Sequence, residues 1–266
     1  MRVSVRETIR RYQNYFLPVG LFGLLLFGGA VICRFDPLAL IAGIPRGIDM
    51  VRHMFPPAWE TFPDLVGPAL ETVEVAFVGT VFGASLSFAI GLVASSNMNS
   101  NRILRNTVRT ILSVERALPD LIVVLFFVAI VGLGPFPGVM ALAAGTIGML
   151  GKLFADAIEE VDPKPVESMV AIGATKAHVI RYAIVSQVIP YLIANTLYRF
   201  EVNIRMSIFL GVVGAGGIGF NLVTSLRLLK YQEAMACIVT VLILVTLCEK
   251  CSERVRRIIV GQELLR

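Results

Sequence analysis

The sequence predicts an all-α membrane protein with about six transmembrane helices. Of its 266 residues, 56% are hydrophobic and only 16% are charged, against roughly 25% charged in an ordinary soluble domain. The mean hydropathy is +0.78. Apolar runs recur along the chain, several of them near the roughly 20 residues that a helix needs to cross a bilayer. They are too numerous and too well spaced for one buried soluble core.

Six apolar runs are the expected spans: 16–33, 75–94, 118–134, 137–153, 183–213 and 234–248. We treat the chain as one domain made of a terminal segment 1–15, a first helix 16–33, a loop 34–67, a core 68–250 and a tail 251–266. No small-x-small cleavage site closes the first run, so we expect it to be retained as a span. The run 183–213 is longer than one membrane thickness at 1.5 Å per residue, which predicts a kink or a re-entrant piece.

Segments rich in lysine and arginine alternate along the chain with segments that contain few of them. They are dense before the first run, between the second and third, in 152–182 and in the tail. Positive charge stays in the cytoplasm, so both termini and segment 152–182 are predicted to lie there. Loop 34–67, with the single Trp59, then forms a proline-stiffened cap on the outer surface. The net charge of +5 reflects this orientation and does not indicate a nucleic-acid partner.

Nothing in the sequence indicates catalysis or a metal site. Cys248 and Cys251 have C-x-x-C spacing, but His53 and His178 are too far along the chain to complete a ligand set, so we expect helix-packing cysteines. No Ser/His/Asp or Cys/His constellation is apparent. The adjacent Glu159 and Glu160 point about 100° apart on a helix and indicate a solvated face. We expect no catalytic residue.

Two glycine motifs resemble nucleotide-binding sequences but lack the required context. VVGAGGIG has G-x-G-x-x-G spacing without a strand before it. We therefore expect its glycines to permit close helix packing or a broken helix that acts as a gate. These glycines are Gly214, Gly216, Gly217 and Gly219, and we include Gly211, which directly precedes the motif.

GTIGMLGKL resembles a phosphate-binding loop. However, Gly145 is one residue too far from Gly151, and Leu153 stands where a magnesium-binding hydroxyl is required. We expect no cofactor in this chain. If ATP drives its function, a separate polypeptide must bind the ATP and its Mg²⁺.

The stretch 162–183 predicts two short amphipathic helices. Asp162 is placed to cap the first helix and Pro163 to begin it, Gly173 can end it, and Thr175 can cap the second. The apolar stripe of the first helix must be buried against lipid headgroups or in a groove of another protein. The pattern alone does not choose between the two.

The fifth run contains charged and polar residues that lipid cannot host. On a helix, Glu201 and Arg205 fall on one face, and Arg199, Asn203 and Ser207 fall on another. Glu201 could pair with Arg205 four residues on while Arg199 reaches the interface. Alternatively, Arg199 or Arg205 with Asn203 could offset an oxyanion along a substrate route. The two interpretations can coexist.

The spacing of Glu167, Gly173-Ala174 and Pro190 resembles the EAA loop of ABC importer permeases. Four further blocks resemble the phosphonate-type permease subunit, a member of the methionine-importer-like superfamily. They are ETVEVAFVGT (71–80), ERALPDLIVVLFFVAIVGLGP (115–135), GTIGMLGKLFADAIEEVDPKPVE (145–167) and YRFEVNIRMSIFLGVVGAGGIG (198–219). Gly145 and Asp120 depart from the histidine and glutamate expected in that subgroup.

The resemblance implies the type I ABC importer permease fold, assembled as a homodimer in the bacterial inner membrane. It also implies a cytoplasmic ATPase docked on the coupling loop 159–182, an extracytoplasmic binding protein, and a phosphonate, phosphite or phosphate substrate. The ATPase-coupling residues that it implies are Glu167, Met169, Val170, Gly173, Ala174 and Thr175. Two rivals are an ion-coupled secondary anion transporter that uses Glu201 and Arg205, and a membrane-embedded enzyme. Co-purification of an ATPase would distinguish an importer subunit from a secondary transporter.

Overall fold

The computed structural model describes the backbone of residues 5–263 and the side chains of residues 18–259. Regular structure in the described part is entirely helical. The chain divides into two compact units, Met1–Arg52 and His53–Arg266. Each is considered by itself below.

The first unit contains helix α1, Val5–Ile32, and most of α2, Pro37–Met54. The expected span 16–33 lies almost wholly within α1, whose apolar side chains from Val19 onward are mostly exposed. Helices α1 and α2 meet at a bend of 54° and together have the length and composition of one broken membrane span. The expected cap 34–67 therefore contains a helix as well as its prolines.

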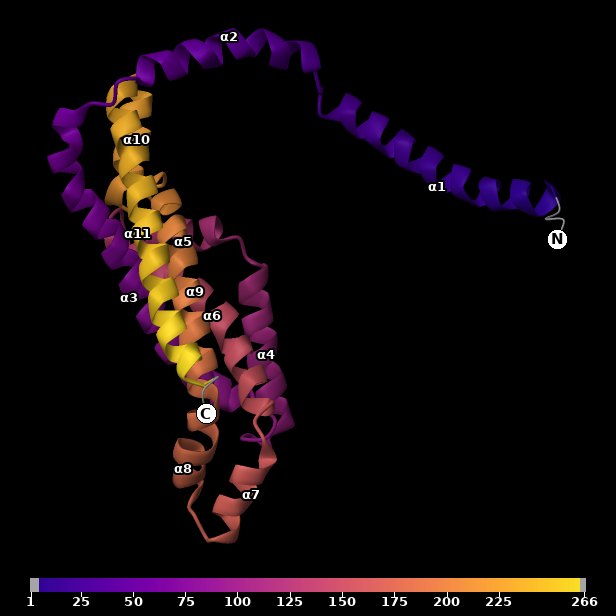
Figure 1. Cartoon of the computed structure of the whole chain (residues 1–266), viewed down its shortest axis with the longest axis vertical. Helices are drawn as coiled ribbons and strands as arrows, with labels where there is room; N and C mark the ends of the chain where they lie inside the picture. Colours follow the sequence, from indigo (N-terminus) through magenta and orange to yellow (C-terminus); the bar gives the residue numbers. More distant parts are fainter. Residues whose placement is uncertain (1–4, 264–266) are drawn as a thin grey trace. The chain divides into compact units, whose positions relative to one another are not determined.

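The second unit is a bundle with a small helical hairpin at one end (Figure 1). Its helices are η1 Trp59–Thr61, α3 Phe62–Ala94, α4 Arg102–Ala117, α5 Asp120–Val131, α6 Pro135–Glu159, α7 Pro163–Ala171, α8 Lys176–His178, η2 Val179–Ile184, α9 Val185–Gly211, α10 Gly217–Arg227 and α11 Tyr231–Glu263. The hairpin is formed by α7 and α8, and we call its side of the bundle the α7 end.

Small residues bring α3 and α6 into close contact. A Cβ atom added at Gly83 would lie 2.6 Å from Thr146 Cβ, and one added at Gly91 would lie 3.1 Å from Phe154 Cβ. Such residues let helix backbones approach closely within membranes, where apolar burial drives association little. The main buried cluster joins these helices to α5, α9 and the segment after α9: Val75, Ala76, Val124, Ala141, Leu142, Ile204, Leu210 and Ala215.

Among the described residues, four helices have the length and apolar composition of a span, or five when the bent pair α1 and α2 is counted as one. The expected span 118–134 differs most from the structure. Its helix, α5, has only 12 residues, about 18 Å at 1.5 Å per residue, which is too short to cross alone.

Helix α4 continues α5 toward the α7 end and packs along α6. There the Leu112 side chain lies against Gly151 and the Glu115 carboxylate against Gly148. We therefore interpret α4 and α5 as one span broken at Leu118 and Pro119. Because α4 is rich in polar residues, the hydropathy of the sequence did not predict this half of the span, and residues 95–117 were expected to form a loop.

A kink or a re-entrant piece was expected within the run 183–213, at no particular residue. A 36-residue helical stretch runs without a break from Lys176 to Gly211. It passes through the wider turn of η2 and contains Pro190. The interruption comes after Gly211, where the chain turns into the short α10.

Candidate coupling and transport site

Local sequence shapes the α7–α8 hairpin. Asp162 caps α7, since its Oδ1 accepts a hydrogen bond from the Lys164 N–H at 3.0 Å. At the other end, the Gly173 N–H donates to Val170 O and the Ala174 N–H to Met169 O. Gly173 has a φ of +79°, the left-handed conformation that ends helices in this way. The predictions for Asp162 and for Gly173 are confirmed, whereas Thr175 stands at the N-cap position of α8 without a side-chain cap hydrogen bond.

The hairpin is fixed to the bundle by an apolar cluster. Ile158, Val179, Ala183 and Ile184 are buried there, and Val166, Met169 and Ala174 from the hairpin pack against them together with Leu92 and Met98. Two of the expected coupling residues, Met169 and Ala174, thus face the bundle. They hold the hairpin in place and leave its other face free.

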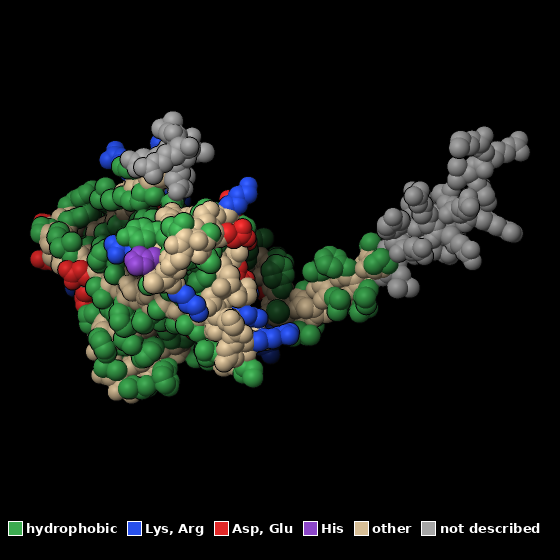
Figure 2. Space-filling view, turned by 90° about the horizontal axis from the view of Figure 1, so that it is seen from below, with side chains coloured by type: hydrophobic (Ala, Val, Ile, Leu, Met, Phe, Trp, Pro, Cys, Tyr) green, Lys and Arg blue, Asp and Glu red, His purple; other side chains and the backbone are tan. Residues whose placement is uncertain are grey.

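The outer face of the hairpin is exposed and partly apolar. Val170 is 60% exposed and Ile172 is 79% exposed, while Glu167, Gly173 and Thr175 are also exposed. The Thr175 hydroxyl lies 2.7 Å from His178 Nδ1. Seen from this end, the surface mixes hydrophobic side chains with Lys and Arg side chains (Figure 2).

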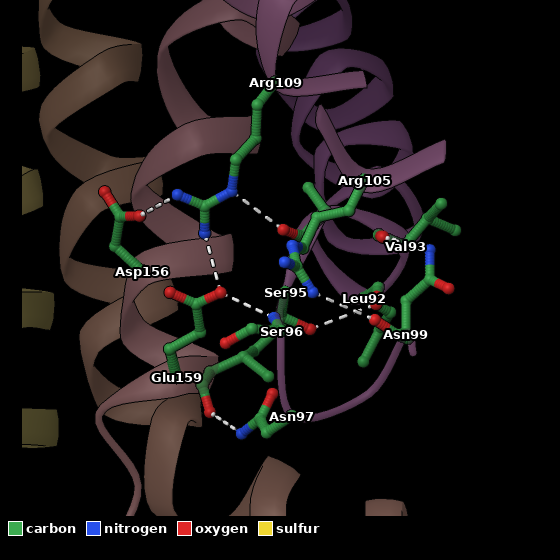
Figure 3. Close-up of polar contacts among 12 residues, drawn as sticks. Leu92, Val93, Ser95, Ser96, Asn97, Asn99, Arg105, Arg109, Asp156 and Glu159 are labelled. Atoms are coloured by element: carbon green, nitrogen blue, oxygen red, sulfur yellow. Dashed lines mark hydrogen bonds and ion pairs between the residues drawn. The ribbon is translucent and has the colours of Figure 1, made fainter. Parts of the chain in front are cut away.

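Arg109, in the middle of α4, joins this helix to the ends of α3 and α6 beside the hairpin (Figure 3). Its Nε donates to Ala94 O at 2.8 Å. Its two terminal nitrogens lie 3.3 Å from an Asp156 oxygen and 2.8 Å from a Glu159 oxygen. We call Arg109, Asp156 and Glu159 the Arg109 clamp.

Two further hydrogen bonds tie the same helix ends together. The Ser96 N–H donates to the Glu159 carboxylate at 2.5 Å, and Asn97 Nδ2 donates to Ile158 O at 2.6 Å. Figure 3 shows these contacts grouped around the end of α6. Because α7 begins four residues after α6 ends, the hairpin is connected directly to this network.

A buried polar network crosses the middle of the bundle. Asn203 Nδ2 donates to Thr80 Oγ1 at 2.8 Å and to Thr146 Oγ1 at 3.0 Å. Arg199 Nε donates to Thr146 Oγ1 at 3.3 Å. Arg199 is only 7% exposed, Asn203 is fully buried, and Ser207 is also buried. This face of α9 is therefore directed into the bundle.

Gly145 makes room for the Arg199 guanidinium. A Cβ atom at this position would lie 2.6 Å from Arg199 Nη2 and 2.9 Å from Asp120 Oδ1. Arg199 thus lies beside an acidic residue from the start of α5. A histidine at position 145 would need this arrangement to change, so the departures at Gly145 and Asp120 are structurally linked.

The other charged face of α9 is paired with α11. Arg256 Nη2 donates to Glu201 Oε1 at 2.9 Å, and Arg205 pairs with Glu249. The expected pair between Glu201 and Arg205 is replaced by these two contacts. The role of both faces as a substrate route stays a prediction.

The five glycines expected to form a gate or a close packing contact lie where α9 passes into α10. Gly214, Gly216 and Gly217 have positive φ angles. A Cβ atom at Gly211 would lie 2.6 Å from the Phe220 backbone nitrogen, and one at Gly219 would lie 1.8 Å from Ile208 O. The backbones of the two helices are therefore in direct contact.

Two side chains of α3 that the sequence analysis did not single out bind the start of α10. The Gly217 N–H donates to the Glu71 carboxylate at 2.9 Å, and the Ile218 N–H donates to Thr72 Oγ1 at 3.0 Å. A carboxylate satisfies free N–H groups at a helix start and complements the helix dipole. The sequence feature that could have indicated this contact is Glu71, an acidic residue just before the apolar run 75–94.

These features define a multi-pass membrane protein of the transport class: a helical bundle with a buried polar network, broken helices and a projecting hairpin. Residues 87–260 match the family described as the binding-protein-dependent transport system inner membrane component. The chain belongs to this family.

Relatives and solved structures agree with the family. The phosphite transport system permease protein PtxC of Stutzerimonas stutzeri is 36% identical over 236 residues, which cover 89% of this chain and 86% of PtxC. The phosphate-import permease protein PhnE of Mycolicibacterium smegmatis is 37% identical over 95% of this chain and 47% of its own length. An inward-facing structure of the MetNI methionine ABC transporter superposes with a TM-score of 0.64 and 24% identity, covering 73% of this chain and 95% of the matched chain.

The chain is therefore the membrane-embedded permease subunit of an ABC importer and not an enzyme. Its fold is that of the type I importer permeases. Proteins of this kind work with an ATPase and a substrate-binding protein. Family membership decides against the secondary transporter and the membrane-embedded enzyme.

Proposed function

We propose that this permease carries a phosphorus oxyanion, namely phosphonate, phosphite or phosphate, inward across the bacterial inner membrane. The observation that carries the proposal is the 36% identity with a phosphite permease across 89% of the chain. The 37% identity with a phosphate-import permease supports the same substrate class. The working unit in this proposal is a homodimer with a cytoplasmic ATPase dimer and an extracytoplasmic binding protein.

The α7 end faces the cytoplasm in this proposal, and both termini lie on that side. The distribution of lysine and arginine supports the orientation. The ATPase binds the hairpin at Glu167, Val170, Gly173 and Thr175, whose side chains or backbone are exposed. ATP and Mg²⁺ are held by the ATPase.

The hairpin acts as a lever during transport. When ATP closes the ATPase dimer, the attached hairpin moves, and its cluster with Ile158 and Ile184 carries the movement into the bundle. The Arg109 clamp extends it to α3 and α4. Such rigid-body coupling opens the central cavity to one side and then to the other, with the glycine contacts after α9 as the gate.

Introducing charge into the exposed apolar face of the hairpin is expected to release the ATPase. The double variant Val170→Asp, Ile172→Asp removes two exposed apolar side chains from the docking surface. Co-purification of the ATPase with the permease should fall strongly, because burying an unpaired carboxylate at an interface is unfavourable. Helical content should persist, since neither residue is buried.

The control is Ile103→Asp, an exposed apolar residue at the start of α4 outside the hairpin. It should retain the ATPase. Equal ATPase recovery from all variants would exclude docking on this face.

Glu167→Arg or Gly173→Val is expected to leave the complex assembled but with ATP hydrolysis uncoupled from uptake.

Substrate class can be tested with the permease, ATPase and binding protein together in proteoliposomes. Uptake of radiolabelled phosphate, phosphite and methylphosphonate is expected to require internal ATP, while sulfate should not be taken up. Uptake of sulfate alone would overturn the assigned substrate class.

A further inference from the structure

Arg116 lies on the surface of the bundle, beside the middle of its neighbouring span α6. A Cβ atom added at Gly148 would lie 3.3 Å from Arg116 Cγ, so the arginine stem passes over the middle of α6. Gly148 is about 20 Å from Pro135 and about 16 Å from Glu159 at 1.5 Å per residue. From sequence alone, Arg116 falls between the second and third apolar runs, in a segment expected to be cytoplasmic.

The Arg116 side chain is exposed in the isolated chain. Within the part of the chain that the structure describes, its guanidinium forms no hydrogen bond or close ion pair, although its charge interacts with that of the neighbouring Glu115. A charged side chain at this depth is rare in membrane proteins and almost always faces the bundle interior or a water-filled cavity. The face that carries Arg116 is therefore not a lipid face.

The helix break beside Arg116 leads independently to the same conclusion. Leu118 and Pro119 interrupt the α4–α5 span, and both are exposed. Irregular backbone at membrane depth is tolerated only where it is buried in protein or lines a water-filled cavity. Both the guanidinium and the break therefore indicate a cavity wall or a contact with a second protein surface.

The other charges at this level are turned inward. The carboxylate of Glu115 lies directly against Gly148, and Asp120 lies beside Arg199 over Gly145. Arg199 and Glu115 interact electrostatically, so the buried arginine is already compensated within the chain. Arg116 is the next residue after Glu115, about 100° further round the helix. Its stem passes the same Gly148 and its charge interacts with the Glu115 carboxylate, but the side chain as a whole is exposed.

We propose that Arg116 is a contact for the phosphorus oxyanion at mid-membrane, on the wall of the central cavity. This inference rests on the proposed function. A guanidinium offers a planar fork of donors that matches two oxygens of a phosphorus oxyanion. One exposed contact is also weak enough to release the anion, as conduction requires. Arg199, Glu115 and Asp120 hold the helix break that presents Arg116.

The test measures ATP-driven phosphate uptake by the complete complex in proteoliposomes. Arg116→Gln keeps a polar side chain but removes the charge, and uptake is expected to fall about tenfold or more, the loss of a charge-assisted hydrogen bond. Arg116→Lys should recover part of the uptake, because the charge returns without the fork. ATP hydrolysis stimulated by loaded binding protein should persist in both variants.

Arg102→Gln is the matched control. Arg102 is an exposed arginine at the start of the same helix, near the α7 end, and its loss should leave uptake at the wild-type level. Unchanged uptake by Arg116→Gln at equal membrane abundance would overturn the assignment while the proposed function stood. Loss of uptake with separation of the two permease copies would instead place Arg116 in their interface. A wild-type complex that moves no phosphorus oxyanion would overturn both proposals.

Discussion

Gly219→Ala is expected to lower the free energy of unfolding by about 1–3 kcal/mol, the usual cost of overpacking. The added Cβ would lie 1.8 Å from Ile208 O and 2.8 Å from Ile208 C. Both are backbone atoms of α9, which cannot rotate aside as a side chain can. To accept alanine, α10 must move away from α9. That movement would also disturb the bonds that Glu71 and Thr72 accept from the start of α10.

The measurement is the midpoint of thermal unfolding in detergent, followed by circular dichroism. Gly23→Ala is the matched control, because Gly23 lies inside α1 with no atom within 4 Å of an added Cβ. Alanine there should be neutral or slightly stabilising, since it favours helix by up to about 1 kcal/mol over glycine. Equal midpoints for both variants would show that the α9–α10 contact is not as tight as the structure has it.

The long apolar helices were predictable from sequence because each carries its own signal. The runs 75–94, 137–153 and 234–248 fall within α3, α6 and α11, where a continuous apolar stretch is enough to identify a span. The full α4–α5 span was not predictable from sequence, because Arg109, Glu115 and Arg116 lower its hydropathy. Their places in the structure depend on α6 and α9, which a local window does not include.

The candidate site shows the same division between local and distant causes. The hairpin follows from Asp162 and Gly173, whose hydrogen-bond partners lie within five residues. The charges of α9 follow from residues far along the chain. A favourable spacing predicted a pair between Glu201 and Arg205. In the structure, Glu201 pairs with Arg256 and Arg205 pairs with Glu249, both on α11. Helical spacing shows which pairs are possible, and tertiary packing decides which form.

Arg109→Gln is expected to uncouple ATP hydrolysis from transport. The change removes two ion pairs and the hydrogen bond to Ala94 O. It leaves Asp156 and Glu159, three residues apart on α6, facing each other without a cation. Arg109 is 30% exposed, so water and salt screen part of the loss, and we expect about 1–3 kcal/mol of destabilisation. The larger effect is mechanical, because α4 is no longer fixed to the end of α6.

The measured quantity is the number of substrate ions taken up per ATP hydrolysed by the complete complex. Arg105→Gln is the control, since Arg105 lies one turn earlier on α4 and makes a single 3.3 Å bond to Asn99 O. It should keep the wild-type ratio. If coupling failed only because the fold was weakened, neutralising the acids with Asp156→Asn and Glu159→Gln beside Arg109→Gln would restore both stability and coupling. If the clamp transmits movement, that triple variant should regain stability while the ratio stays low, because no ion pair then joins α4 to α6.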